Sequence, residues 1–322
     1  MLSFDKSGYL FIKSLINPNT GLISGIEGDV LTTVYKNALV AMAFIHQEDQ
    51  VDTERIFNNF QKYYLRNKAD FHGFPQTWNV ETGLPDTGSI HWEADSALLL
   101  LALNYYHQKM GSSKQYGNLV QEILAWLAHQ ANLCDLIMAE GVAEMYAALA
   151  LFSGNHDIRK SLMRLRQCFY GSEKICSADY HHNLNHIVHG ALVFGDSSGF
   201  KYLPDFVRSE TWKYNESIKI TACSAFSTDH IIDVGMSAQV LLALKILSKQ
   251  KNASFQKIGL RGELEKLFLT GKQDHEAKGL PYCVSSHGSS QSCRCPALEP
   301  TCYLLFYYWD FNPLAPGEQV PG

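Results

Sequence analysis

The stretch that decides the fold reads His91-Trp-Glu-Ala-Asp-Ser-Ala-Leu-Leu-Leu-Leu-Ala-Leu-Asn-Tyr-Tyr-His-Gln-Lys-Met110. It opens with a polar, acidic turn and then becomes small and apolar, which predicts a helix over 91–110. Small residues such as Ala and Ser let neighbouring helices pack closely, so this helix is expected in an inner layer. The same pattern starts five other segments, whose first residues are Asp29, Glu140, Tyr180, Asp229 and Pro296.

Between these segments lie helices of a second kind, with Lys and Arg on one face. The spacing of their apolar residues predicts amphipathic helices that cover the inner layer and keep one face in water. They span 52–66, 113–130, 155–170 and 260–270, and Asp52 is expected to cap the first of them. Strand signals are scarce, and the remaining helices are expected over 4–15, 32–47, 140–153, 180–194, 203–214, 230–248 and 296–309.

The alternation of inner and outer helices predicts an all-α fold. About twelve helices in 322 residues make roughly six helical hairpins, and a ring of six hairpins is an (α/α)6 toroid, here a single domain over 1–322. The N-termini of the inner helices would then converge and line a cavity with acidic and aromatic groups. A two-domain all-α bundle is the alternative.

Composition excludes several classes of protein. Hydrophobic residues make up 46% of the chain, which is enough to offset the entropy of ordering it and excludes a disordered protein. The formal charge is −5, from 27 basic and 32 acidic residues without a basic block, so no nucleic-acid partner is expected. No apolar run approaches the roughly 20 residues that span a bilayer, so no membrane partner is expected either.

The N-terminus and the cysteines bear on the compartment. Met1–Gly8 lacks a basic region followed by an apolar run, which predicts a cytoplasmic protein without a secretory signal. Eight cysteines fit that prediction if they are reduced. Cys283, Cys293 and Cys295 crowd together but lack the C-x2-C spacing of a zinc knuckle. We expect semi-buried thiols there rather than metal ligands.

Several blocks resemble the bacterial six-hairpin glycosidase-like proteins, a glycoside-hydrolase-like group with (α/α)6 toroids. The resemblance implies the toroid and a carbohydrate substrate. Members of the group usually carry tryptophan where this chain has Ala97, Ala238 and Tyr303, which implies a smaller substrate or chemistry other than hydrolysis. The blocks run in order along nearly the whole chain, at 33–39, 91–102, 140–148, 233–243, 299–306 and 311–314.

Glycoside hydrolysis needs two carboxyl groups that flank the bond, one of them protonated. Acidic residues at the starts of the inner helices are the candidates, with helix capping or the helix dipole as their structural alternative. Glu140 and Glu144 lie one turn apart, so their like charges would raise one pKa. The catalytic candidates are Asp95, Glu140, Glu144, Asp233 and Glu299.

Polar and aromatic side chains near the same helix starts are candidates for substrate binding, because an aromatic ring can stack on a sugar ring. Hydrophobic filling of the toroid is the alternative for the aromatic residues. The candidates are Asp29, Tyr35, Trp78, His91, Trp92, Glu93, Tyr146, His182 and His186, with Trp212 and Tyr214 as further aromatic walls.

A histidine cluster occurs at His181, His182, His186 and His189. Spacings of three and four residues place imidazoles on one side of a helix, which suits metal ligands, but the H-E-x-x-H motif of a metalloprotease is absent. We expect a polar helix start, no metal and no cofactor.

Together these patterns predict a glycoside-hydrolase-like enzyme that acts on a carbohydrate or sugar-containing metabolite through a carboxylate pair in an acidic pocket. One alternative is a lyase or epimerase on the same scaffold, in which His or Tyr abstracts a proton. The others are a metal-dependent enzyme and a non-catalytic binding or biosynthetic accessory protein. The expected partner is a small molecule or an oligosaccharide, and the oligomeric state stays open.

Overall fold

The computed structural model describes residues 3–111, 115–136, 139–171, 184–213, 217–224, 231–249, 259–270, 278–284 and 295–315. Helices dominate these residues, and most strands are short. The chain forms two compact units. Unit 1 contains Met1–Leu15, Gly25–Gly28 and Cys176–Asn312, and unit 2 contains Ile16–Ser24, Asp29–Ile175 and Pro313–Gly322.

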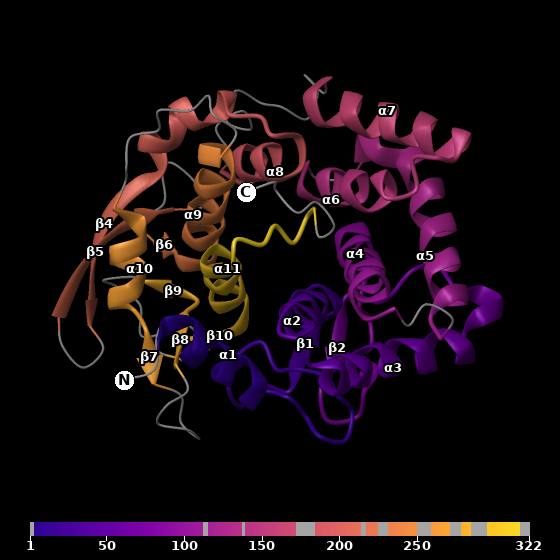
Figure 1. Ribbon diagram of the computed structural model, residues 1–322, viewed down its shortest axis with the longest axis horizontal. Coiled ribbons are helices and arrows are strands. Elements are labelled where there is room, and N and C mark those ends of the chain that lie inside the picture. Colours follow the sequence, from indigo (N-terminus) through magenta and orange to yellow (C-terminus); the bar gives the residue numbers. More distant parts are fainter. Residues whose placement is uncertain are drawn as a thin grey trace. The chain divides into compact units, whose positions relative to one another are not determined.

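Three helices form the inner layer of unit 2: α2 (Val34–His46), α4 (Glu93–Met110) and α6 (Ala139–Ala150). α4 packs against both α2 and α6 (Figure 1). The apolar run 97–103 is almost completely buried, so this part of α4 has no solvent-exposed face. The prediction of an inner helix over 91–110 is confirmed.

Three amphipathic helices cover this layer. α3 (Gln50–Arg66) packs on α2, α5 (Gly117–Gln130) on α4, and α7 (His156–Gly171) on α6 (Figure 1). In α3 the buried positions Ile56 and Phe60 lie one turn apart, as the apolar spacing predicts. The predicted outer helices of this unit are therefore present, with shifted ends.

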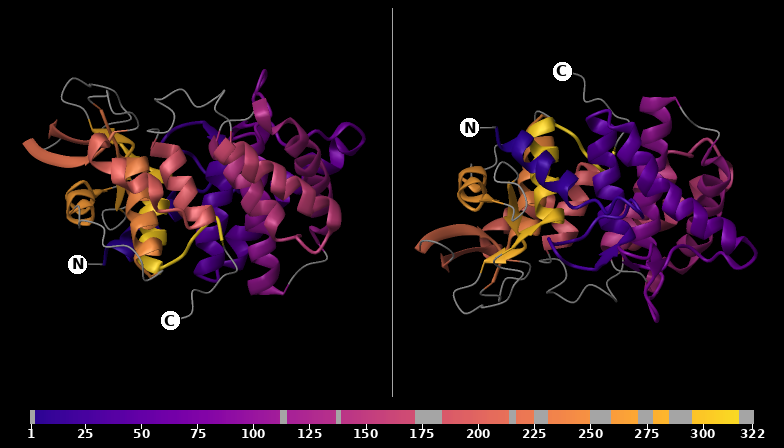
Figure 2. Two further views of the ribbon diagram at one scale, coloured as in Figure 1. Left: turned by 90° about the horizontal axis from the view of Figure 1, so that it is seen from above. Right: turned by 90° about the horizontal axis from the view of Figure 1, so that it is seen from below.

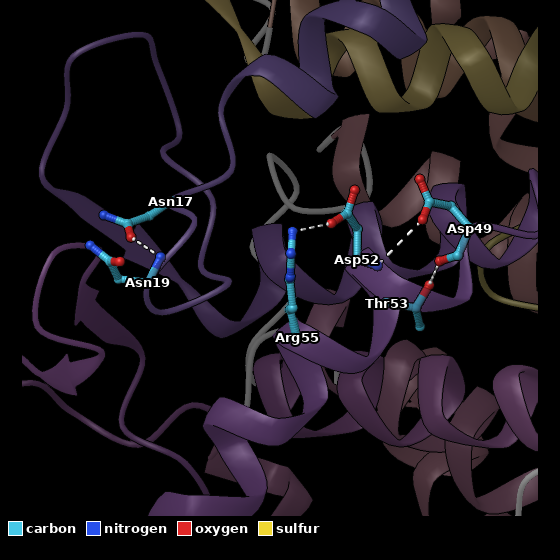
Figure 3. A network of polar contacts seen from close by, with 6 residues as sticks. All are labelled: Asn17, Asn19, Asp49, Asp52, Thr53 and Arg55. Atoms are coloured by element: carbon cyan, nitrogen blue, oxygen red, sulfur yellow. Dashed lines mark hydrogen bonds and ion pairs between the residues drawn. The ribbon is translucent and has the colours of Figure 1, made fainter.

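Asp49 rather than Asp52 caps α3. The Asp52 backbone N–H donates to the Asp49 carboxylate at 3.3 Å, and the Thr53 hydroxyl donates to the Asp49 carbonyl at 2.7 Å (Figure 3). The Asp52 carboxylate pairs instead with Arg55, at 2.8 Å, inside the first turn. Either aspartate is a good cap in sequence terms, so the spacing alone could not separate them.

A small antiparallel sheet precedes α2. The Val34 backbone N–H donates to the Gln76 carbonyl at 3.1 Å, so the sheet fixes the residue at which α2 begins. In this sheet β1 (Leu31–Thr33) pairs with β2 (Thr77–Asn79), which pairs with β3 (Leu84–Pro85).

In unit 1, α9 (Val234–Lys249) and α11 (Leu298–Trp309) lie side by side and are mostly buried (Figure 2). α8 (Leu184–Phe194) also packs on α9. α1 (Phe4–Ser14) covers α11, and α10 (Leu260–Lys266) covers α9. Unit 1 therefore repeats the pattern of apolar helices behind covering ones.

The helix expected over 203–214 is wrong. Ser198–Phe206 is a 3-10 helix (η4), and it leads into a hairpin in which β4 (Val207–Lys213) pairs with β5 (Ser217–Cys223). Ile220 and Ala222 are buried, whereas Lys219 is exposed and Thr221 is half-buried, which is the two-residue period of a strand. That alternation was the signal available in the sequence.

Short strands fix the starts of α9 and α11. α9 begins directly after one short strand, and α11 begins directly after another. Each of these strands pairs with a partner strand, and Tyr282 joins the two partner strands. The pairs are β6 (Ile232–Asp233) with β9 (Cys283–Val284), β10 (Pro296–Ala297) with β8 (Lys278–Pro281), and β7 (Leu269–Thr270) with β8.

The cysteines are not all reduced. Cys134 and Cys168 form a disulfide that joins the 3-10 helix η2 (Ala131–Leu136) to α7, and Cys283 is also disulfide-bonded. A disulfide-bonded Cys283 is not available as a zinc ligand. Because disulfides persist mainly in oxidising compartments, these bonds weigh against the predicted cytoplasmic location.

Loss of the Cys134–Cys168 bond is expected to lower the free energy of unfolding by about 3 kcal/mol, because it closes a loop of 34 residues in the unfolded chain. Urea unfolding of the Cys134→Ser/Cys168→Ser double variant measures this. Cys295→Ser, at a free buried thiol, is the control for losing a sulfur atom alone. A double variant as stable as the wild type would contradict the prediction.

No helix in the described part of the chain is long and apolar enough to cross a membrane.

Candidate functional site

The predicted catalytic carboxylates come together as two pairs, one in each unit. Asp233 and Glu299 form a pair in unit 1, and Asp95 and Glu144 form a pair in unit 2. Glu140 begins α6, but its side chain lies outside the described residues. The two pairs differ sharply in their exposure to solvent.

Asp233 immediately precedes α9 and caps it. The Met236 backbone N–H donates to Asp233 Oδ1 at 2.8 Å, and the Ser237 hydroxyl donates to the Asp233 carbonyl at 2.6 Å. The side chain is half-buried. Burial raises the pKa of Asp233, and the hydrogen bonds from the Met236 and Gly235 N–H groups oppose that rise. The pKa of Asp233 is therefore higher than that of an ordinary aspartate.

Glu299 lies in the first turn of α11 and is also half-buried. Gln239, one turn along α9 from Gly235, directs its Nε2 toward Glu299 Oε1 at 3.5 Å. The start of α11 is fixed by the Leu298 backbone N–H, which donates to the Gly25 carbonyl at 2.9 Å. Two helices therefore bring these two carboxyl groups together.

Gly235 is the point on which the pair converges. A Cβ atom on Gly235 would lie 3.3 Å from Asp233 Oδ1 and 3.9 Å from Glu299 Oε1. Glycine costs about 0.5–1 kcal/mol relative to alanine inside a helix, so its presence in the first turn of α9 calls for a reason. The reason visible here is that a methyl group would crowd the Asp233 carboxylate.

Tyr282 is the third group at this site. The charge of Glu299, then burial, then the charge of Asp233 raise the pKa of the Tyr282 phenol. Two free thiols lie nearby: burial raises the pKa of Cys223 to about 12, and burial together with Glu299 raises that of Cys302. Both thiols stay neutral and buried, so neither is a candidate nucleophile.

The Asp95 carboxyl is fully buried, at 0% exposure. Its Oδ1 accepts a hydrogen bond from the Tyr35 backbone N–H at 2.7 Å, which ties α4 to the first turn of α2. Burial raises the pKa of Asp95 to about 8. The charge of Glu144 adds to the rise, whereas the Tyr35 N–H, the Gln76 side chain and Lys36 lower the pKa.

Glu144, on α6, is 1% exposed, so this pair is closed to solvent. A buried acid whose pKa is raised by a second buried acid is typical of catalytic dyads, but such pairs also occur in structural networks. The hydrogen bond to the start of α2 gives Asp95 a structural task.

The predicted substrate-binding residues fall into three groups. Tyr35, Trp92, Glu93 and Tyr146 are half-buried on unit 2, His186 is half-buried on α8 of unit 1, and Asp29 and His91 are exposed. The Asp29 carboxylate accepts from the Leu31 backbone N–H at 3.2 Å, as in an ordinary loop turn. His182, Trp212 and Tyr214 lie outside the described residues or side chains.

Trp78 cannot wall a sugar pocket. It is fully buried, its Nε1 donates to the Pro75 carbonyl at 2.6 Å, and its ring packs edge-on against Phe60 and Tyr63. Burial also corrects the interpretation of the three positions at which the resembling proteins usually carry tryptophan. They lie fully buried in helices, so their identity says nothing about substrate size: Ala97, Ala238 and Tyr303.

The described residues contain no group of three or more His, Cys, Asp or Glu that could hold a metal ion. Of the histidine cluster, His181 and His182 lie outside the described residues, while His186 and His189 are on α8. The His189 ring Nδ1 contacts the Asn185 carbonyl at 2.9 Å.

Sequence reasoning missed Gly235, Gln239 and Tyr282. The first two follow Asp233 by two and six residues, so an apolar helix that keeps Gly and Gln near an acidic start was the available signal. Tyr282 had no comparable signal, because only the pairing of β6 with β9 brings it beside Asp233.

No protein-family model matches the chain, and no curated protein matches it in sequence. Solved structures do match. A D-mannose isomerase structure has a TM-score of 0.63 at 12% identity, and a glycosidase has 0.65 at 9%; both cover 95% of this chain and 95% of their own. A sugar epimerase from a ruminal bacterium has a TM-score of 0.57 at 12% identity, over 94% of this chain and 96% of its own.

At these identities the likeness shows the fold alone. It confirms the fold class predicted from the sequence, an all-α (α/α)6 toroid.

Proposed function

We propose that this protein is a sugar-processing enzyme of the glycoside-hydrolase-like type, with Asp233 and Glu299 as its acid–base pair. The observation that carries the proposal is the convergence of both carboxyl groups on Gly235, which leaves room beside them. The sugar-processing activities named for the structural neighbours support a carbohydrate as the substrate.

The two carboxyl groups suit different roles. Glycoside hydrolysis needs one group that gives a proton to the leaving oxygen and a second that acts as base or nucleophile. Burial raises the pKa of Asp233, so we assign it the role of the acid. Glu299, contacted by the Gln239 amide, serves as the second carboxylate.

Asp95 and Glu144 have a supporting role in this proposal. Both are buried away from solvent, and Asp95 holds the start of α2 through Tyr35. Buried networks of this kind fix the arrangement of inner helices rather than contact a substrate. The half-buried Tyr35, Trp92, Glu93 and Tyr146 remain candidates for binding sugar.

A sugar isomerase or epimerase is the second candidate. It is favoured by neighbours of both kinds, a D-mannose isomerase and a sugar epimerase, whose TM-scores of 0.63 and 0.57 compare with 0.65 for the glycosidase. In an isomerisation the pair would move a proton between neighbouring carbons of one sugar. In an epimerisation it would remove a proton from one carbon and return a proton to the opposite face of that carbon.

One assay tests and separates the two reactions. The full chain is incubated in D2O with nitrophenyl glycosides, malto-oligosaccharides, glucose and mannose, and products are followed by NMR. Hydrolysis releases a new reducing end without deuterium on carbon, whereas isomerisation or epimerisation by proton transfer exchanges a carbon-bound proton for deuterium. If none of these sugars is turned over or bound at millimolar concentration, the proposal is wrong.

Gly235→Ala is expected to reduce turnover at least tenfold while the protein stays folded. The new methyl group would occupy the space beside Asp233 and Glu299, whereas alanine itself favours helix by about 0.5–1 kcal/mol. The matched control is Gly262→Ala in α10, where a Cβ would meet nothing within 4 Å. Turnover and thermal unfolding are measured for both variants. Full activity of Gly235→Ala would contradict the proposed site beside Asp233 and Glu299.

A further inference from the structure

Tyr282 is held beside the Asp233–Glu299 pair by the backbone. The Val234 N–H donates to the Tyr282 carbonyl at 3.2 Å, and the pairing of β6 with β9 sets Asp233 opposite Cys283. Tyr282 thus sits at the junction of β8 and β9, next to the residue that begins α9. Its position does not depend on a flexible loop of its own.

The Tyr282 side chain is open to solvent while it lies in the field of both carboxylates. It is 41% exposed, unlike the buried Tyr106 and Tyr303. Its hydroxyl makes no hydrogen bond within the described part of the chain. The charges of Glu299 and Asp233 both oppose ionisation of the phenol, so the phenol stays a neutral O–H donor.

Gln239 adds an acceptor to the same site. The side chain is only 4% exposed, its Nε2 faces Glu299, and its buried Oε1 has no hydrogen-bond partner among the described residues. An unsatisfied buried amide oxygen costs roughly 1–3 kcal/mol, so it calls for an explanation. A donor would satisfy Gln239 Oε1, and a sugar oxygen can accept from the Tyr282 phenol.

We propose that Tyr282 is a third catalytic residue of this site, whose phenol donates a hydrogen bond to an oxygen of the sugar held between Asp233 and Glu299. This role rests on the proposed function of that pair. The ligand class is a polyhydroxylated ring without a required charge, because the groups that face it are carboxyl, amide and phenol groups.

The test is calorimetric titration of the full chain with gluco-, manno- and galacto-configured iminosugars, which carry the hydroxyl pattern of a sugar and a positive charge at the ring. Tyr282→Phe keeps the ring and removes the hydroxyl, and is expected to weaken binding about five- to twentyfold. The matched control is Tyr170→Phe on α7, because Tyr170 is 42% exposed and lies in the other unit. Its affinity is expected to stay within about twofold of the wild type.

The outcomes separate the two proposals. If Asp233→Asn and Glu299→Gln lose binding while Tyr282→Phe behaves like Tyr170→Phe, the role of Tyr282 is overturned and the carboxylate pair stands. If Asp233→Asn and Glu299→Gln bind as the wild type does, or the wild type binds none of the iminosugars, the proposed function fails and the role of Tyr282 fails with it.

Discussion

Glu299→Gln and Asp233→Asn are each expected to lower kcat/KM on the sugar substrate by about a hundredfold to ten-thousandfold. An amide matches a carboxyl group in shape, but it can neither give a proton to a leaving oxygen nor act as a base. Asp233→Asn retains an oxygen that can accept from the Met236 N–H, so the cap of α9 survives. The expected loss is therefore one of chemistry rather than of folding.

The control is Glu210→Gln, at a half-buried glutamate of β4 that belongs to the same unit. Its kcat/KM is expected to equal that of the wild type. Circular dichroism and thermal unfolding show whether each variant is folded. If both variants of the pair keep a third or more of wild-type activity, the acid–base role moves to Asp95 and Glu144.

Asp95→Asn is expected to make the protein more stable than the wild type at alkaline pH. The pKa of Asp95 is about 8 in the folded chain and 3.8 as its reference value. Below pH 3.8 the carboxyl group is protonated in both states and has no effect on the pH dependence. Between these values the unfolded state releases its proton first, so wild-type stability falls as pH rises. Above about pH 8 both states are ionised and the loss is complete.

The size of the effect follows from the same linkage. The slope is at most about 1.4 kcal/mol for each pH unit, which gives an upper limit of about 6 kcal/mol across the window. Asparagine keeps an acceptor for the Tyr35 N–H but does not ionise. The free energy of unfolding of the variant therefore does not fall with pH through this residue. Urea unfolding from pH 5 to pH 9 measures the difference between variant and wild type.

Asp205→Asn is the control for this experiment, because Asp205 is exposed in the described structure. Its difference from the wild type should not grow as pH rises. Parallel stability curves for Asp95→Asn and the wild type would show that burial does not hold the Asp95 proton, and the supporting role given to this residue would then need revision.

Much of the fold was predictable from local sequence patterns. The apolar run after Asp95 identified an inner helix, because a helix without a polar face must be covered on all sides. The Lys and Arg faces of residues 52–66 and 155–170 identified covering helices by the same reasoning. The β4–β5 hairpin was missed, since two strands within a helical chain give only a short alternation.

The candidate site was less predictable. Asp95, Glu144, Asp233 and Glu299 were all found from their places at helix starts, but no spacing in the sequence relates Asp233 to Glu299. They are 66 positions apart in the numbering and meet because α9 packs on α11. Trp78 was misjudged because an aromatic residue in a loop-rich stretch has the same appearance whether it fills a core or lines a pocket.

The sequence by itself determined the helices, their inner or outer place and the set of acidic residues at their starts, because periodicity and composition act over a few turns of one segment. Only the tertiary structure decided which acids pair, which are closed to solvent and which glycine leaves room between them. Those properties depend on strand register and helix contacts between residues far apart in the chain. The pairing of β6 with β9 and the packing of α9 on α11 turn separate acids into a site.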